Sequence, residues 1–130
     1  MLGREPPRRY NLAPVSKVEP RAQAKHAHGI EVGASAGQRA AIRRMAQDAG
    51  VAIACLATSC SYTAADPAAL SRTMDDSRAL IALAHDIGAP AMRVFGGTIP
   101  QGMSLEHAAR QLAECLAKLA PEAQDAGVTL

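Results

Sequence analysis

Apolar and polar positions follow one pattern that the chain repeats three times. In each unit an amphipathic stretch with helical spacing ends in Asp-x-Gly, at Gly50, Gly88 and Gly127, and an apolar run follows at once. Glycine closes helices because it adopts the left-handed conformation without steric cost. A Val/Ile/Ala-rich run is typical of a strand covered on both faces. The pattern therefore predicts alternating helices and parallel strands.

The same pattern gives the bounds of the predicted elements. Ser35 should cap a helix over 36–49 that buries Ala41, Ile42, Met45 and Ala49 and exposes Arg39, Arg43 and Arg44. Asp66 and Pro67 begin a second helix, which runs to about residue 86. A third starts after Ser104 with Leu105, Ala109 and Leu112 on its core side, and Pro121 should kink it or split its last turn. Strands are predicted at 29–32, 51–57, 91–95 and from 128 onwards.

The start of the chain gives weaker signals. Residues 1–15 are rich in arginine and proline, and they predict a disordered basic tail before a domain over 16–130. Ser16 and Glu19 have capping-box spacing, which predicts a short helix ending near residues 28–29.

The length of the repeat decides between two parallel architectures. The three glycines lie 38 and 39 residues apart. An even period favours a closed barrel over an open Rossmann-like sheet, and no glycine-rich phosphate fingerprint supports the open sheet. A (β/α)8 barrel takes about 250 residues. The predicted fold class is therefore α/β, a partial (β/α)8 TIM barrel with parallel strands and outer helices.

Composition indicates the type of domain and the cellular environment to expect. The 130 residues are 48% hydrophobic with a net charge of +2, one Phe, two Tyr and no Trp, which predicts a globular domain of modest core. The three cysteines show neither disulfide nor zinc spacing, so a reducing cytoplasm is expected. No apolar run reaches 18 residues, and we expect no membrane span or export signal.

Candidate chemistry lies where the predicted strands end, since active sites of βα folds form there. Glu31 and Arg93 are charged residues inside predicted strands, and each would need a partner, for which the other is the obvious candidate. Ser59 lies in the polar segment that follows the central apolar run. Gly96 and Gly97 allow close approach of a ligand to the backbone. The histidines and acidic residues form no metal-ligand pattern, so no metal site is predicted.

Several of these stretches resemble a known family. Gly-Ile-Glu-Val at 29–32, the 50–59 run, the Leu-Ala-x-x-x-Gly-Ala-Pro-x-x-Arg-Val-Phe-Gly-Gly segment at 83–97 and the end at 123–130 resemble sugar phosphate isomerases and epimerases. These belong to the xylose isomerase-like TIM-barrel superfamily. The resemblance implies that Glu31 and Arg93 lie at the barrel mouth, near a sugar or sugar phosphate. It also implies a divalent metal, held by residues that would follow Leu130.

Three functions are open at this point. The first is a truncated isomerase or epimerase whose parent reaction moves a proton next to a carbonyl, with no cofactor bound by this chain itself. The second is a non-catalytic half-barrel that forms homo-oligomers or binds a partner through its open strand edges. The third is a DNA-binding fragment similar to abasic-site endonucleases. It ranks last, because 14 basic against 12 acidic residues give no sustained positive face, and we expect no nucleic-acid partner.

Overall fold

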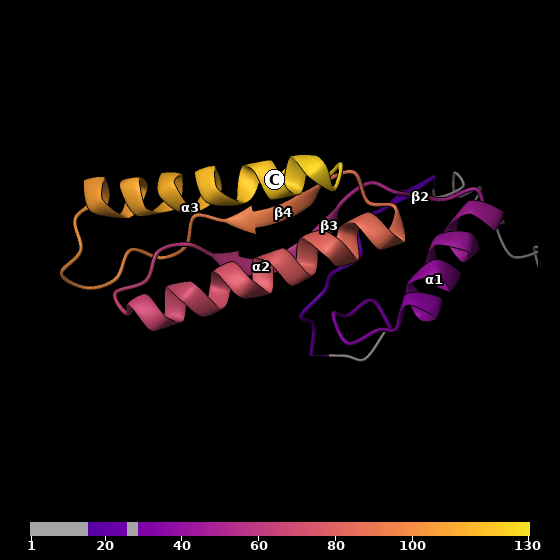
Figure 1. Ribbon diagram of the computed structural model, residues 1–130, viewed down its shortest axis with the longest axis horizontal. Coiled ribbons are helices and arrows are strands. Elements are labelled where there is room, and N and C mark those ends of the chain that lie inside the picture. Colours follow the sequence, from indigo (N-terminus) through magenta and orange to yellow (C-terminus); the bar gives the residue numbers. More distant parts are fainter. Residues whose placement is uncertain (1–15, 26–28) are drawn as a thin grey trace, which may run out of the picture.

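Helices and parallel strands alternate along the chain in the computed structural model, which describes residues 16–25 and 29–130 (Figure 1). The elements are β1 (Lys17–Val18), α1 (Ala36–Asp48), β2 (Ala52–Ile53), β3 (Leu56–Ser61), α2 (Pro67–Ile87), β4 (Met92–Phe95) and α3 (Leu105–Asp125). The tail predicted over 1–15 lies outside the described residues. None of the helices in the described part of the chain is long and apolar enough to span a bilayer.

Neighbouring strands are parallel and follow the order of the chain: β1 comes first, then β2 with β3 as its continuation, then β4. β1 pairs with β2 and β3 pairs with β4, both in parallel. Two further parallel bridges, Arg21 with Ala57 and Ala91 with Thr129, connect these pairs to each other and to the last residues. Each crossover between neighbouring strands contains one helix, so this is the βα repeat of a barrel. The described residues form part of such a barrel and do not close it.

One extra residue interrupts the strand in the middle of this arrangement. Val18 pairs with Ile53 but Arg21 pairs with Ala57, so β1 advances by three residues where its neighbour advances by four. The additional residue lies at Ala54–Cys55, between β2 and β3. A bulge of this kind changes which face of the sheet the following side chains occupy.

The helix boundaries agree with the sequence signals. Ser35 caps α1 and forms a capping box with Gln38. Asp66 caps α2 with Pro67 at its first position, and Gly88 ends it with φ of 84°. Ser104 caps α3, which continues through Pro121 as a single helix and is not split there. The capping predictions are confirmed because each rests on side chains within one turn of the helix end, whereas the split expected at Pro121 does not occur.

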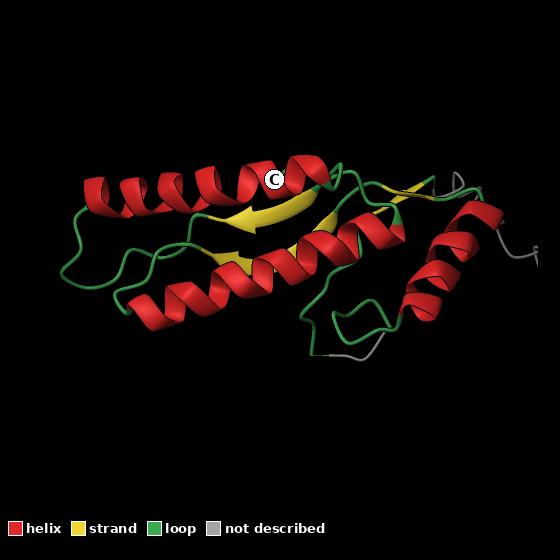
Figure 2. Ribbon diagram, viewed as in Figure 1, coloured by secondary structure: helices red, strands yellow, loops and turns green. Residues whose placement is uncertain are grey.

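The core lies between the strands and the two long helices. Figure 2 shows the two long helices alongside the strands, and the sequence colours of Figure 1 show that α2 and α3 run in the opposite direction to the strands. The largest fully buried side chains of this layer are those of Leu56, Tyr62, Leu80, Leu83, Ile87, Met92 and Leu119. Leu56 and Met92 are in register and face the helices together. The next residues along the two strands face the other way, so the strands have one apolar and one polar face.

Three predictions about elements are wrong, and so are several about burial. Residues 17–18 form a strand where a helix was expected, and residues 29–32 form bends and a turn where a strand was expected. The predicted strand at 51–57 is two strands separated by the bulge. Met45 is 70% exposed and Leu105 72% exposed, and Ala49 and Ala109 are exposed as well, so none of the four belongs to the core. The side chain of Arg39, expected on the solvent face, is only 13% exposed.

Candidate functional site

An ion pair crosses the middle strand on the polar face of the described sheet and joins β4 to the residues that follow β1. Arg93 of β4 donates through Nε to Glu19 Oε1 at 2.7 Å, with both side chains a little under half exposed. The Arg93 guanidinium also lies 5.2 Å from the centre of the Phe95 ring. Ala57 is in register with Arg93, and its small side chain lets the guanidinium cross the middle strand. Charged donors, a charged acceptor and an aromatic face are therefore gathered at one place.

A second polar contact lies toward the carboxyl ends of the same strands. Arg21 Nη2 donates to Ser59 Oγ at 3.1 Å, and the Ser59 amide donates to Gln23 Oε1 at 2.8 Å. Gln23 adopts φ of 60°, a left-handed conformation that residues other than glycine rarely take. Arg21, Gln23, Ala24, Lys25 and Ser59 line a hollow of about 540 Å³, which we call the Arg21 hollow. Its position is that of active sites in parallel βα folds.

Glu31 does not pair with Arg93, and that prediction is wrong. Its Oε2 instead accepts a hydrogen bond from the backbone amide of Gln23 at 3.0 Å. The carboxylate therefore holds the turn next to the Arg21 hollow. It belongs to the site through Gln23, which carries the left-handed backbone, because backbone strain of this kind persists only where surrounding contacts hold it.

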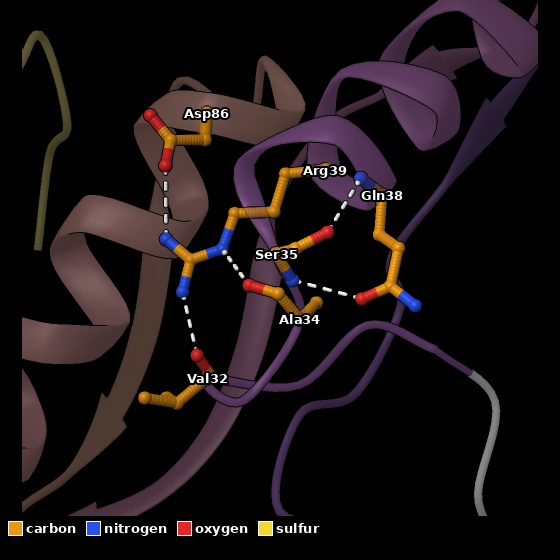
Figure 3. Close-up of polar contacts among 6 residues, drawn as sticks. All are labelled: Val32, Ala34, Ser35, Gln38, Arg39 and Asp86. Atoms are coloured by element: carbon orange, nitrogen blue, oxygen red, sulfur yellow. Dashed lines mark hydrogen bonds and ion pairs between the residues drawn. The ribbon is translucent and has the colours of Figure 1, made fainter.

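The loop that carries Glu31 is anchored by Arg39 of α1 (Figure 3). The guanidinium donates to Val32 O at 2.7 Å, to Ala34 O at 3.0 Å and to Asp86 Oδ2 at 2.9 Å. Asp86 lies in the last turn of α2. One largely buried cation thus ties the loop to two helices, which explains why this arginine is not on the solvent face predicted for it.

Gly96 and Gly97 follow β4 and close against the end of β3. Thr63 Oγ1 lies 3.0 Å from both Gly96 O and Thr98 O. Gly97 has φ of 99°, and a Cβ atom there would overlap Thr63 Oγ1 and crowd Ser61. Glycine is required at 97 for this turn. The two glycines therefore shape the rim next to Ser61 and Phe95.

Cys55 adjoins the ion pair at the bulge. Burial, followed by the negative charge of Glu19, raises the pKa of its thiol, and the backbone and charge of Arg93 act in the opposite direction. A raised pKa leaves the thiol protonated at neutral pH, which makes it a poor nucleophile. We therefore assign Cys55 no catalytic role.

The described residues do not provide a set of ligands for a divalent metal ion. Among residues 16–25 and 29–130 no group of three His, Cys, Asp or Glu side chains is gathered. Glu19, the carboxylate of the polar face, already accepts from Arg93. No step proposed below runs through a metal ion.

Sequence reasoning placed Arg93 and Ser59 near the site but missed Glu19 and Arg21. Pro20 lies between them, and proline argues against a central strand. The available signal was the alternation Val18-Glu19-Pro20-Arg21, with charged residues two apart, which is the period of one strand face.

The comparisons with known proteins agree with the fold described above. Residues 18–130 match the family described as xylose isomerase-like TIM barrel, which is most of the chain. The chain belongs to the xylose isomerase-like TIM barrel family. No curated protein matches the sequence.

Three solved structures illustrate the likeness. A protein of Sinorhizobium meliloti 1021 is 28% identical with a TM-score of 0.59, over 71% of this chain and 36% of its own. A xylose isomerase domain protein from Planctomyces limnophilus is 18% identical with a TM-score of 0.61, over 88% and 43%. A D-psicose 3-epimerase, solved in the presence of D-fructose, is 16% identical with a TM-score of 0.71, over 87% and 40%. The last two show the fold, and this chain spans about two fifths of each neighbour's length.

Proposed function

We propose that this chain forms part of the sugar-binding site of an isomerase or epimerase that moves a proton at a carbon next to a carbonyl. The observation that carries the proposal is the Glu19–Arg93 pair on the barrel-interior face. It is supported by membership of the family and by a structural neighbour named as an epimerase. The substrate would be a small ketose or aldose.

The chemistry of the three side chains suits a sugar. Arg93 has guanidinium N–H groups beyond the one bonded to Glu19 and can donate to a carbonyl or hydroxyl oxygen. Glu19 has acceptor capacity left for a sugar hydroxyl. Phe95 is 44% exposed and offers an apolar surface to the C–H face of a sugar ring. These residues bind and orient the substrate, and Arg93 would stabilise negative charge that develops on the carbonyl oxygen when the proton leaves.

The proposal is tested by titrating the ¹⁵N-labelled protein with D-fructose and D-psicose. We expect saturable shifts of the amide resonances of Ser59, Arg93 and Phe95. Arg93→Gln should weaken binding by about 10-fold or more, because a hydrogen bond to a charged group contributes about 1.5–3 kcal/mol.

Arg78→Gln is the matched control. Arg78 also forms an exposed ion pair, with Glu122 at 3.0 Å, but on the outer helices. Its loss should leave sugar affinity unchanged. If both arginine variants bind the sugars as the unaltered protein does, or if no amide near Arg93 shifts, the proposed function is wrong.

A further inference from the structure

The Arg21 hollow combines two cations from the segment that follows β1 with the hydroxyl group of Ser59, in the second half of β3. Four of its five lining residues are polar: Arg21, Gln23, Lys25 and Ser59. Its volume, about 540 Å³, is within the range of about 300–1,000 Å³ that small-molecule sites occupy. The size and the lining both suit a small polar ligand.

The positive charges of the hollow are not neutralised by ion pairs within the described part of the chain. Arg21 donates one N–H to Ser59, and no carboxylate among residues 16–25 and 29–130 pairs with Arg21 or Lys25. Because Ser59 Oγ accepts the bond from Arg21, its own proton can be donated to a ligand. The hollow therefore has at least three kinds of donor and an excess of positive charge.

One carboxylate lies close to these cations. Glu31 Oε2 accepts from the Gln23 amide, and its charge offsets part of the positive field. Two cations against one carboxylate still leave a net positive charge. The same contact fixes the Gln23 backbone, and Gln23 in turn binds the Ser59 amide, so Ser59 and Arg21 are held in place before a ligand arrives. Binding to such a site costs little ordering of its own side chains.

We propose that Arg21, Lys25 and Ser59 form a binding site for an oxyanion carried by the substrate, either a phosphate ester or a sugar carboxylate. Arginine suits both groups because its planar fork matches their paired oxygens. Glu19 and Arg21 are two residues apart in the segment that follows β1, so their Cα atoms lie within roughly 7 Å of each other. A single anionic sugar can therefore reach the oxyanion site while its hydroxyls contact Glu19 and Arg93. This last step rests on the proposed function, whereas the oxyanion site does not.

The experiment distinguishes binding of an anion from binding of a neutral sugar. The ¹⁵N-labelled protein is titrated in parallel with inorganic phosphate, with D-glucuronate and with neutral D-fructose. We expect phosphate, glucuronate or both to give saturable shifts at Gln23 and Ser59, with affinity that falls as salt rises. Tighter binding of phosphate would indicate a phosphate ester, and tighter binding of glucuronate a sugar acid.

Variants at exposed positions test the residues without disturbing the core. Arg21→Gln and Lys25→Gln should each weaken anion binding about 10-fold, the value of a charged hydrogen bond. Arg21→Lys should retain part of the affinity because it keeps the charge. Arg44→Gln, on the exposed face of α1, removes a charge of the same type and should have no effect.

Failure of this inference differs from failure of the proposed function. If phosphate and glucuronate give no saturable shifts, or bind Arg21→Gln and Arg44→Gln equally well, the oxyanion site is wrong even if fructose binds through Arg93. If phosphate binds, Arg21→Gln abolishes that binding, and no sugar shifts the amide resonance of Arg93, the oxyanion site is supported and the proposed sugar site is wrong.

Discussion

Arg93 on β4 reaches across the middle strand to Glu19, which follows β1, and the two charges meet at 2.7 Å although 74 residues separate them in the chain. Ala57 lies between the two strands, in register with both Arg21 and Arg93. The pair is half exposed, and exposed pairs contribute about 0.2–1 kcal/mol to stability. Its position on the polar face therefore matters more for binding than for folding.

A double-mutant cycle tests whether the Glu19–Arg93 pair contributes little to folding stability. Glu19→Gln, Arg93→Gln and the double variant should differ in free energy of unfolding by a coupling energy below about 1 kcal/mol. Urea unfolding followed by circular dichroism measures it. A coupling energy of several kcal/mol would show that the pair is a structural element, and the binding role assigned to it would need revision.

Arg39, unlike the Glu19–Arg93 pair, should contribute strongly to folding stability. Arg39→Met removes three hydrogen bonds and leaves Asp86 and two carbonyls without this donor, so we expect a loss of stability of about 2–3 kcal/mol. Hydrogen exchange should also accelerate over residues 29–34. Arg44→Met, on the same helix but exposed, is the control and should change stability by less than about 0.5 kcal/mol. Equal stability of the two variants would contradict the anchoring role of Arg39.

Two glycine-to-alanine substitutions distinguish the stability cost of steric overlap from that of backbone strain. Gly97→Ala must both adopt φ of 99° and displace Thr63, whereas Gly102→Ala adopts φ of 83° with no atom within 4 Å of the new Cβ. We expect Gly102→Ala to cost about 1 kcal/mol from strain alone and Gly97→Ala clearly more. Thermal unfolding of both variants measures the difference. If the two melt at the same temperature, the Thr63 contact with the glycine loop is not as close as described.

Stability should fall at alkaline pH for a reason that lies in the core. Tyr62 is fully buried and its hydroxyl bonds Ser77 at 2.8 Å. Burial raises the pKa of Tyr62 above its ordinary 10.0, and the Ser77 bond acts in the opposite direction. The folded state therefore holds this proton more tightly than the unfolded state. Its contribution to stability is complete below pH 10 and is lost as pH rises past 10 through the folded pKa.

Cys55 and Cys115 act in the same direction from an ordinary pKa of 9.0. The free energy of unfolding should thus decline above about pH 9 and more steeply above about pH 10. Tyr62→Phe should remove most of the steeper part, at a cost of about 1 kcal/mol at neutral pH from the lost hydrogen bond. A Tyr62→Phe protein with an unchanged alkaline profile would rule out this assignment.

The sequence was sufficient for features determined by neighbouring residues. Ser35, the Asp66-Pro67 pair, Ser104 and Gly88 marked helix ends correctly because capping acts within one turn. The repeat predicted the parallel strands, and the resemblance of the stretches at 29–32, 50–59, 83–97 and 123–130 indicated the family. Glu31 shows where such reasoning stopped: Gly-Ile-Glu-Val has strand propensity, yet its carboxylate holds a turn through Gln23. Strand propensity depends strongly on context, and here tertiary contacts decided.

Arg39 and Glu19 show that partners distant in the sequence could not be predicted from local patterns. Nothing near Arg39 in the sequence indicates that Asp86, 47 residues away, accepts from it. β1 is two residues long and Pro20 follows Glu19, so the short alternation around Pro20 was too weak a signal to mark Glu19 as part of a strand face. The partners that define the site come from different strands, and the sequence alone does not show which strands are neighbours.

The extra residue at Ala54–Cys55 is the one residue of this stretch that the pairing with the first strand does not use. Deleting Ala54 or Cys55 would remove the bulge and leave Ile53 opposite Val18 and Ala57 opposite Arg21, so the side chains of β3 would keep their faces. A deletion between Leu56 and Ser59 would have the opposite result, because Ser59 would turn into the layer beneath α2 and α3 and Cys60 would take its place beside Arg21. Single-residue deletions at Ala57 or Thr58 are thus expected to abolish both core and site, while deletions at the bulge are tolerated far more readily.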